Sequence, residues 1–351
     1  MREQWQQVGN PSSLHTAGRR ARKVVEESRE QIAELIGAKP ADIVFTSGGT
    51  EADNLGIKGI ARSGDRRRIL VSAVEHHAVL DPAEALAHEG FEVELLPVDH
   101  FGRVDMARLE ARLDADVALV AVMWANNEVG TVQPVTEIAQ LCRQHGVPLH
   151  CDAVQALGQL PLEVSGIASV ALSGHKVGGP VGVGALVLDR DVPVRPLVHG
   201  GGQERDIRSG TLDVAGVAGF AAALAAPKVD TTALRDAMIA GVLEAVPDAV
   251  LNGDPVDRLP NNAHFCFPGC PGDALLMLLD AAGIAVSTGS ACTAGIPQPS
   301  HVLVAMGADE VLARSSLRFS LGWNSTAEDV AAVIAALPHA VQRARRAGGG
   351  R

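Results

Sequence analysis

The predicted fold depends on a strand that runs into a glycine-rich turn, IVFTSGGTE at residues 43–51. The first four residues are β-branched or aromatic, and a helical pattern over residues 51–62 follows the turn. Backbone N–H groups and a hydroxyl at such a helix start can hold a phosphate group. The turn is neither a Walker loop, which needs Gly-Lys-Ser/Thr, nor a Rossmann G-x-G-x-x-G fingerprint. The stretch therefore indicates either a phosphate cradle or a helix that is simply capped at its N-terminus.

Strands and helices continue to alternate up to about residue 220, and this alternation predicts a large α/β domain. Strands joined by helical crossovers are typical of a mostly parallel sheet. We therefore expect a mostly parallel seven-stranded sheet flanked by helices such as 78–88 and 135–145. The expected strands are 42–46, 68–72, 92–96, 117–123, 148–152, 169–172 and 184–188.

The pattern changes after residues Ala226-Pro227, where a smaller α+β domain is expected. A loop rich in Gly, Ser and Pro, residues 287–299, contains Cys292 and belongs to this domain. We predict a large domain over residues 10–222 and a small domain formed by residues 1–9 and 223–351. The expected elements of the small domain are helices 231–245 and 272–282, a helix from 326, and strands 263–267 and 316–320.

Composition and charge exclude several classes of protein. The 351 residues carry 30 basic and 41 acidic side chains, a net charge of −11, which argues against nucleic-acid binding because phosphate backbones need a concentrated basic surface. The longest apolar stretches, 117–125 and 214–226, are shorter than the ~18 residues of a membrane span. The N-terminus lacks the order of a signal peptide, and the five cysteines are irregularly spaced. The reducing cytoplasm is therefore the expected compartment.

One spacing of cysteines could suggest a metal site. Cys266 and Cys270 are separated by three residues, and His264 lies close to them. However, Phe265 and Phe267 alternate with these residues, as in a strand of the core. We therefore expect no metal site.

Two residues complete a set that one cofactor requires. Asp152 ends strand 148–152, and strand ends of this kind face the crevice in which α/β sheets bind ligands. Lys176 follows the next strand, where we expect it to be partly desolvated and suited to imine formation, although a lysine that extends into solvent is the alternative. Pyridoxal phosphate needs a phosphate cradle, a carboxylate and a lysine amine, so it is the predicted cofactor. In a chain without Tyr, His76 could stack on its ring.

Ten short motifs in register also resemble a known family. They are NPSSLH at 10–15, FTSGGTEADN at 45–54, EHHAVL at 75–80, NNEVG at 126–130, DAVQ at 152–155, SGHK at 173–176, GGGQER at 200–205, RSGT at 208–211, GSACT at 289–293 and RSSLRFS at 314–320. Together they resemble the cysteine desulfurases of the NifS and IscS group. This group is part of the class V aminotransferase branch of the fold-type I pyridoxal phosphate enzymes.

The resemblance implies a role for each candidate site residue. Lys176 bonds the cofactor, Asp152 pairs with its pyridine nitrogen, and His76 covers its ring. Asn127 and Arg318 receive the substrate carboxylate, for which an arginine fork is well suited. The other implied cofactor contacts are Gln155 at the phenolate oxygen, Gly49, Thr50, Ser173 and His175 at the phosphate, and Thr211, which reaches the phosphate of a neighbouring subunit and so implies a homodimer.

By the same resemblance, Cys292 is the sulfur acceptor. Small residues precede it in its loop, and Pro297 and Pro299 follow it. As a thiolate it would attack the sulfur of the bound L-cysteine, keep that sulfur as a persulfide and leave alanine. The implied function is that of a cysteine desulfurase, which passes sulfur to an iron-sulfur scaffold protein or another acceptor.

Two alternatives remain open at this level. A selenocysteine lyase or another class V enzyme would share most motifs, although aminotransferases need no thiol at position 292. Members of the family also carry an Asp-x-Ala-Ala-Thr-Thr-Pro segment ahead of the NPSS motif, and the nine residues before Asn10 do not resemble it. This difference raises a third hypothesis, a catalytically silent homologue that binds partner proteins.

Overall fold

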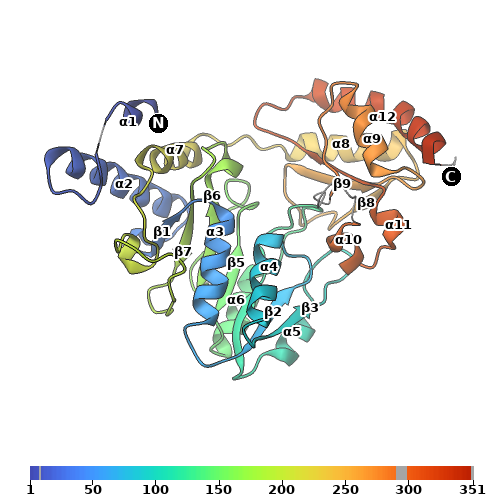
Figure 1. The fold of residues 1–351 in the computed structure, drawn as a ribbon. Helices are drawn as coiled ribbons and strands as arrows, with labels where there is room; N and C mark the ends of the chain where they lie inside the picture. Colours follow the sequence, from blue (N-terminus) through green and yellow to red (C-terminus); the bar gives the residue numbers. More distant parts are fainter. Residues whose placement is uncertain (8, 290–298, 349–351) are drawn as a thin grey trace. The chain divides into compact units, whose positions relative to one another are not determined.

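The computed structural model describes residues 1–7, 9–289 and 299–348, and the chain divides into two compact units (Figure 1). The sequence predicts residues 1–9 in the small domain, but residues 1–7 lie in the first unit, where helix α1 (Arg2–Trp5) contacts helix α7 (Val214–Ala225). The first unit consists of residues 1–96, 106–124 and 133–227, and the second of residues 97–105, 125–132 and 228–351.

The first unit is built on a mostly parallel seven-stranded sheet, as the sequence predicts. The strand order is β1-β7-β6-β5-β4-β2-β3. Pairing is parallel from β6 through β5, β4 and β2 to β3, whereas β7 runs antiparallel to both β1 and β6. The strands are β1 Ile43–Thr46, β2 Arg68–Ser72, β3 Glu92–Leu96, β4 Val117–Ala121, β5 Leu149–Asp152, β6 Ser169–Ser173 and β7 Gly184–Leu188.

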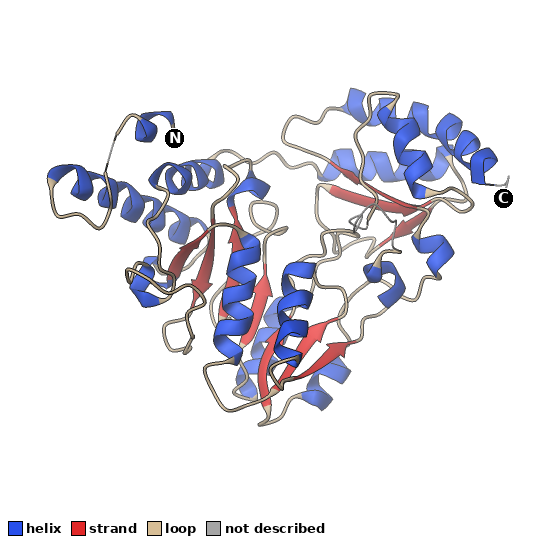
Figure 2. Ribbon diagram, in the orientation of Figure 1, coloured by secondary structure: helices blue, strands red, loops and turns tan. Residues whose placement is uncertain are grey.

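Helices flank this sheet (Figure 2). All residues of β1, β4, β5, β6 and β7 are buried, which matches the nearly continuous apolar runs of strands covered on both faces. The helical run that starts at Gly49 changes to π geometry over Leu55–Gly59. The helices are α2 Thr16–Leu35, α3 Gly49–Asn54, α4 His77–Ala87, α5 Met106–Arg112, α6 Val135–Gln144 and α7, with short 3-10 turns η1 Pro40–Asp42, η3 Gly174–Val177 and η4 Glu204–Asp206.

The strand directions bring several candidate residues to one edge of this sheet. Because β7 is antiparallel to β1 and to β6, the carboxyl ends of β1, β2, β5 and β6 all lie at the same edge. These ends are Thr46, Ser72, Asp152 and Ser173. In open α/β sheets this is the edge at which ligands bind.

The second unit contains an antiparallel three-stranded sheet in the order β10-β9-β8. Strands β9 (Asn262–Cys266) and β10 (Ser316–Ser320) are predicted by the sequence, whereas β8 (Val250–Asn252) is not. In the register of the sheet, Arg318 is opposite His264, and His264 is opposite Asn252. These three polar side chains therefore share one face of the sheet.

The other face of this sheet is apolar and forms the core of the second unit. Phe265, Leu317 and Phe319 are buried there, with the Phe265 and Phe319 rings 6.0 Å apart in an edge-on arrangement. The helices of the unit are α8 Thr232–Ala245, α9 Gly272–Asp280, α10 His301–Ala305, α11 Glu310–Ala313 and α12 Ala327–Gly348. Helices α8, α9 and α12 supply the apolar side chains that cover this face of the sheet (Figure 1).

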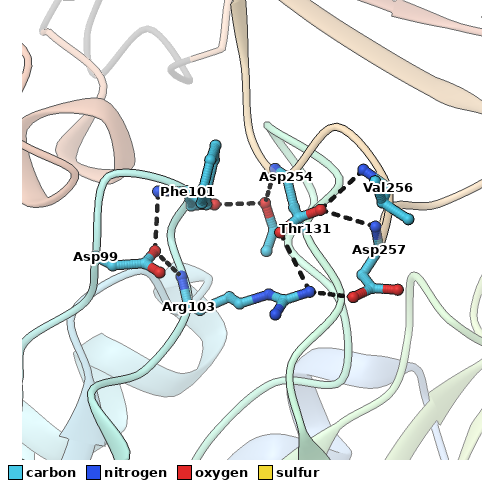
Figure 3. Close-up of polar contacts among 7 residues, drawn as sticks. All are labelled: Asp99, Phe101, Arg103, Thr131, Asp254, Val256 and Asp257. Carbon is cyan, nitrogen blue, oxygen red and sulfur yellow. Dashed lines mark hydrogen bonds and ion pairs between the residues drawn. The ribbon is translucent and has the colours of Figure 1, made fainter.

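Polar contacts explain why residues 97–105 and 125–132 belong to the second unit (Figure 3). The Thr131 hydroxyl donates to the Phe101 carbonyl oxygen at 2.6 Å and accepts from the Asp254 amide at 3.0 Å. The Arg103 guanidinium pairs with Asp254 at 3.2 Å and also with Asp257. Three distant parts of the sequence are thus joined, and the segment that carries Asn127 is held in this unit.

Within the described ranges, no helix combines the length and the apolar character that crossing a membrane requires.

Candidate active site

Asp152 is a predicted site residue whose pKa is strongly shifted. It ends β5, is buried, and accepts a hydrogen bond from the Val154 amide at 2.8 Å. Burial, together with the nearby Asp53 carboxyl, raises the pKa of Asp152 from 3.8 to about 8, although Lys176 opposes this shift. A buried carboxyl of this kind favours a cationic partner, because such a partner restores its charged form. A protonated pyridine nitrogen would be one such partner.

A buried pair that the sequence does not reveal lies behind Asp152. His150 precedes Asp152 by two residues on β5, so both side chains are on the same face. Its Nε2 lies 3.2 Å from Asp53 Oδ1, and its Nδ1 lies 2.8 Å from the Ser169 hydroxyl oxygen. Burial lowers the pKa of His150 to about 4, so the ring is neutral near pH 7. The alternation within β5 is the one sequence signal that could have identified His150.

Gly56, within the π segment, leaves room for the His150 ring. A Cβ on Gly56 would lie 2.4 Å from His150 Nδ1, which is too close for any side chain. Single π turns within helices are frequent at functional sites. The π segment 55–59 thus carries the glycine against which the His150 ring packs, next to Asp152 on β5.

The glycine-rich turn after β1 lies close to the ends of β5 and β6. Gly48 has φ +153°, and the Thr46 hydroxyl donates to its carbonyl oxygen at 2.9 Å. Gly49 is buried, and a Cβ there would lie 2.6 Å from Val154 Cγ2 and 3.6 Å from Ser173 Cβ. The turn is thus packed as closely as glycine allows, and Thr50, the next residue, is exposed.

Lys176 lies in η3, directly after β6, together with two other predicted residues. The Ser173 hydroxyl oxygen and His175 Nδ1 are 2.8 Å apart. Partial burial and the neighbouring Lys176 ammonium lower the pKa of His175. Lys176 itself is exposed, so the partial desolvation expected from the sequence is wrong for this structure. Its short turn packs against helix α7, with Gly174 buried, but leaves Lys176 exposed.

The remaining predicted residues of the first unit are placed as follows. His76 is the N-cap of α4, and its Nδ1 accepts from the Ala78 amide at 3.0 Å, so a neutral ring carries its proton on Nε2. Gln155 is half-buried in the turn after β5. Thr211 is exposed between η4 and α7. Gly49 packs against Ser173 and Val154, and Asp152 lies on the strand that pairs with β6, so these three residues lie close together at the sheet edge.

In the second unit, Arg318 and Asn127 lie together. Arg318 Nη1 donates to the Asn127 carbonyl oxygen at 2.7 Å. Within the described part of the chain, the buried Arg318 Nε and Asn127 Oδ1 atoms have no hydrogen-bond partner. Burial lowers the pKa of Arg318, although the Glu128 carboxylate opposes this effect. A donor and an acceptor that are both unsatisfied and adjacent indicate a site for a small polar ligand.

Glu128 contacts both ends of the segment that contains Cys292. The Ser300 hydroxyl donates to Glu128 Oε2 at 2.5 Å. On the other side, a Cβ on Gly289 would lie 2.7 Å from the same oxygen, so a larger residue there would displace the Glu128 carboxylate. Cys292 itself lies outside the described residues. Glu128 and Ser300 are further residues that the sequence interpretation did not single out.

The four described cysteines are free, buried and weak nucleophiles. Burial raises the pKa of Cys142 to about 12 and that of Cys266 to about 11, and it also raises those of Cys151 and Cys270. The thiolate is the reactive form, so these four are poor candidates for sulfur transfer. Among the residues that the structure describes, no group of three or more His, Cys, Asp and Glu is arranged to hold a metal.

Comparisons with known proteins identify the family. The profile of the class-V aminotransferases matches residues 1–333. An IscS-like cysteine desulfurase of Mycobacterium tuberculosis is 55% identical, with 97% of this chain and 91% of the relative covered. The cysteine desulfurase NifS of Azotobacter vinelandii is 42% identical, with 97% and 89% covered.

Solved structures agree with this result. One described as a NifS-like protein matches with a TM-score of 0.88 and 35% identity over 95% of this chain and 92% of its own. SspA in complex with cysteine matches with a TM-score of 0.82 and 32% identity over 92% and 93%. The resemblance seen in the motifs is confirmed, and the chain belongs to the class-V aminotransferase family, in its group of IscS- and NifS-like cysteine desulfurases.

Proposed function

We propose that the chain uses pyridoxal 5′-phosphate to remove sulfur from L-cysteine, giving alanine and a persulfide on Cys292. One observation carries this proposal beyond family membership. Ser287, five residues before Cys292, pairs through its backbone with Arg318, with N···O distances of 2.7 and 3.1 Å. The candidate residue for the substrate carboxylate and the stem of the cysteine segment are therefore neighbours within one unit.

The residues of the first unit fit the proposed cofactor. Asp152 is a buried carboxyl that a protonated ring nitrogen would return to its charged form. Gly49, Thr50, Ser173 and His175 would hold the phosphate, and Gln155 would hydrogen-bond the phenolate oxygen. When bound, pyridoxal phosphate supplies an aldehyde that joins an amine and a ring that withdraws electrons. Lys176 would provide that amine, and His76 would cover the ring.

The residues of the second unit fit the carboxylate of a free amino acid. The Arg318 Nε donor is buried and lacks a partner among the described residues, and Asn127 lies beside this guanidinium. A guanidinium binds a carboxylate through two parallel hydrogen bonds, which fixes orientation as well as affinity. With its carboxylate fixed in this way, L-cysteine would present its side-chain sulfur at a constant distance from Arg318.

Cys292 would accept the sulfur. It follows Gly289 in the sequence with two residues between them. Its thiolate would form an S–S bond with the substrate sulfur while the C–S bond of the substrate breaks. The electron pair of that bond remains on the carbon, which then takes up a proton and becomes the methyl group of alanine.

We also propose the assembly and partners that the family implies. The functional form would be a homodimer in which Thr211 reaches the cofactor phosphate of the other subunit. The persulfide sulfur would pass to an iron-sulfur scaffold protein or another acceptor. The four free cysteines of the described chain are consistent with a reducing compartment, the cytoplasm.

Turnover of L-cysteine by the purified protein tests the function. With cofactor and a reductant, the unmutated chain should produce alanine and sulfide in equal amounts. Cys292→Ser should keep the absorbance of bound cofactor and lose sulfide release, whereas Lys176→Ala should be inactive. Bound cofactor without turnover in the unmutated chain would favour a silent homologue, and alanine formation by Cys292→Ser would refute the persulfide step.

A further inference from the structure

Two ion pairs fasten the segment 200–211 to the part of the first unit that forms the phosphate cradle. The first is deeply buried: the Arg29 guanidinium donates to both carboxylate oxygens of Glu204, at 2.7 and 2.9 Å. Glu204 Oε2 also accepts from the Phe45 amide at 2.7 Å. Phe45 is in β1, the strand that leads directly into the glycine-rich turn. One end of the segment is thus fixed to the strand before the cradle.

The backbone of this segment is strained where it is fastened. Glu204, Arg205 and Asp206 have successive φ values of 45°, 61° and 63°. Residues other than glycine rarely adopt φ values in this left-handed region, and three such residues in succession are more unusual still. Such strain persists where surrounding contacts determine it, and it is often found at functional sites. The Arg29–Glu204 pair is one of the contacts that hold this segment.

The second ion pair reaches the cradle itself. Arg208 Nε and Nη2 donate to Glu51 Oε1 and Oε2, at 2.7 and 3.1 Å. Glu51 Oε2 also accepts from the Ser47 amide at 2.7 Å. Glu51 directly follows Thr50, a candidate phosphate contact, and Ser47 opens the same turn. A side-chain carboxylate is therefore hydrogen-bonded to the backbone of the same turn that would hold the phosphate, itself an anion.

This carboxylate would oppose phosphate binding if it were not neutralised. Two negative charges repel each other, and the repulsion is reduced when an opposite charge forms a close pair with one of them. Although partial burial of Glu51 opposes the effect, its hydrogen bonds with Arg208 and Ser47 keep its pKa below the ordinary value, so it is ionised near pH 7. In the described structure, Arg208 is the group that neutralises it.

We propose that Glu51 and Arg208 are a positioning pair for the cofactor phosphate, in which Glu51 shapes the turn and Arg208 cancels its charge. The inference rests on the proposed function, because it takes the 47–50 turn as the phosphate site. Arg208 acts through Glu51 in this arrangement and does not itself bind the phosphate. The affinity for the phosphate should therefore decrease as the summed charge of Glu51 and residue 208 becomes more negative.

A series of variants tests this dependence on charge. Arg208→Ala leaves a net charge of −1 on the pair and should raise the dissociation constant of pyridoxal phosphate on the order of tenfold, the modest size expected for partly exposed charges. Glu51→Gln leaves +1 and should keep or tighten binding. The double variant is neutral again and should recover most of the affinity that Arg208→Ala loses.

The measurement is a titration of the cofactor-free protein with pyridoxal phosphate, followed by absorbance. Inorganic phosphate is the second probe, because its stabilisation of the cofactor-free protein against heat reports the cradle without the ring. Arg208→Lys keeps the charge and should bind nearly as the parent does, which keeps the test decisive if Arg208→Ala does not fold. Arg62→Ala removes another arginine–glutamate pair, Arg62–Glu89, at the far end of the same helical run, and should change neither result.

The outcomes separate the inference from the function. A double variant that binds as weakly as Arg208→Ala would overturn the inference, because Arg208 would then contact the phosphate directly or merely hold the loop. Affinities that follow the charge of the pair would support it. If the unmutated chain bound no pyridoxal phosphate, both the inference and the proposed function would be contradicted.

Discussion

Asp152→Asn is expected to change how the stability of the cofactor-free protein depends on pH. Asparagine has nearly the volume of aspartate, and its oxygen can still accept the hydrogen bond that the Val154 amide donates at 2.8 Å. It cannot ionise. The substitution therefore isolates the free energy of placing one carboxylate in the interior of the first unit.

The expected magnitude follows from the pKa of Asp152, which burial raises from 3.8 to about 8. Between these two values the folded protein binds a proton that the unfolded chain releases. The contribution of Asp152 to the free energy of unfolding is therefore complete below pH 3.8 and falls by about 1.4 kcal/mol for each pH unit as the pH rises to about 8. The full loss is on the order of 5 kcal/mol, and the Asn variant should not show it.

The assay is urea unfolding of the cofactor-free proteins, followed by circular dichroism, between about pH 5 and about pH 8. The stability of Asp152→Asn relative to the parent should increase steadily across this range. Burial also raises the pKa of Asp53 and Glu75, and both are present in the two proteins, so the measured difference contains the Asp152 carboxyl and its coupling to these two neighbours. Asp65→Asn, at an exposed aspartate, is the control. A difference between variant and parent that does not change with pH would refute the reasoning.

Two further predictions concern the substrate and the cradle. Arg318→Ala should raise the KM for L-cysteine by about thirtyfold or more, because a carboxylate that loses a buried charged partner loses about 2–5 kcal/mol of binding. Steady-state kinetics measure this effect, and Arg314→Ala, at an exposed arginine, is the control. An unchanged KM would dismiss this role of Arg318. Gly49→Ala should lower stability by about 1–3 kcal/mol and weaken cofactor binding, because its Cβ would lie 2.6 Å from Val154 Cγ2. Urea unfolding and cofactor titration measure both effects. Gly64→Ala, with nothing within 4 Å of its Cβ, is the control, and equal results for the two variants would contradict the packing argument.

The sequence predicts the large sheet well because its signals are local. Each strand is a short apolar run, and the helices between the strands have their own periodicity. The position of Asp152 at a strand end follows from the same pattern, and the structure brings it together with Gly49 and Ser173. Strand β8 is missed because it has only three residues, directly before the turn at Gly253.

The remaining features depend on contacts between distant parts of the chain. Glu51 and Arg208 are 157 residues apart, and although each lies in a recognisable motif, neither motif indicates that the two side chains pair. The same is true of Thr131 and Asp254, which assign residues 125–132 to the second unit. The exposure of Lys176 depends on how η3 leaves the sheet, which local composition does not reveal. Local patterns thus locate the candidate residues, whereas tertiary packing determines their surroundings.

The position of the transferred sulfur tests the central claim most directly. The cofactor-loaded, unmutated protein would be mixed with an equimolar amount of L-cysteine without reductant, alkylated, cleaved into peptides and weighed by mass spectrometry. The account predicts one additional sulfur atom on the peptide that contains Cys292, and an equal amount of alanine. Alanine without that additional sulfur, or the sulfur on one of the four buried cysteines instead, would contradict the account.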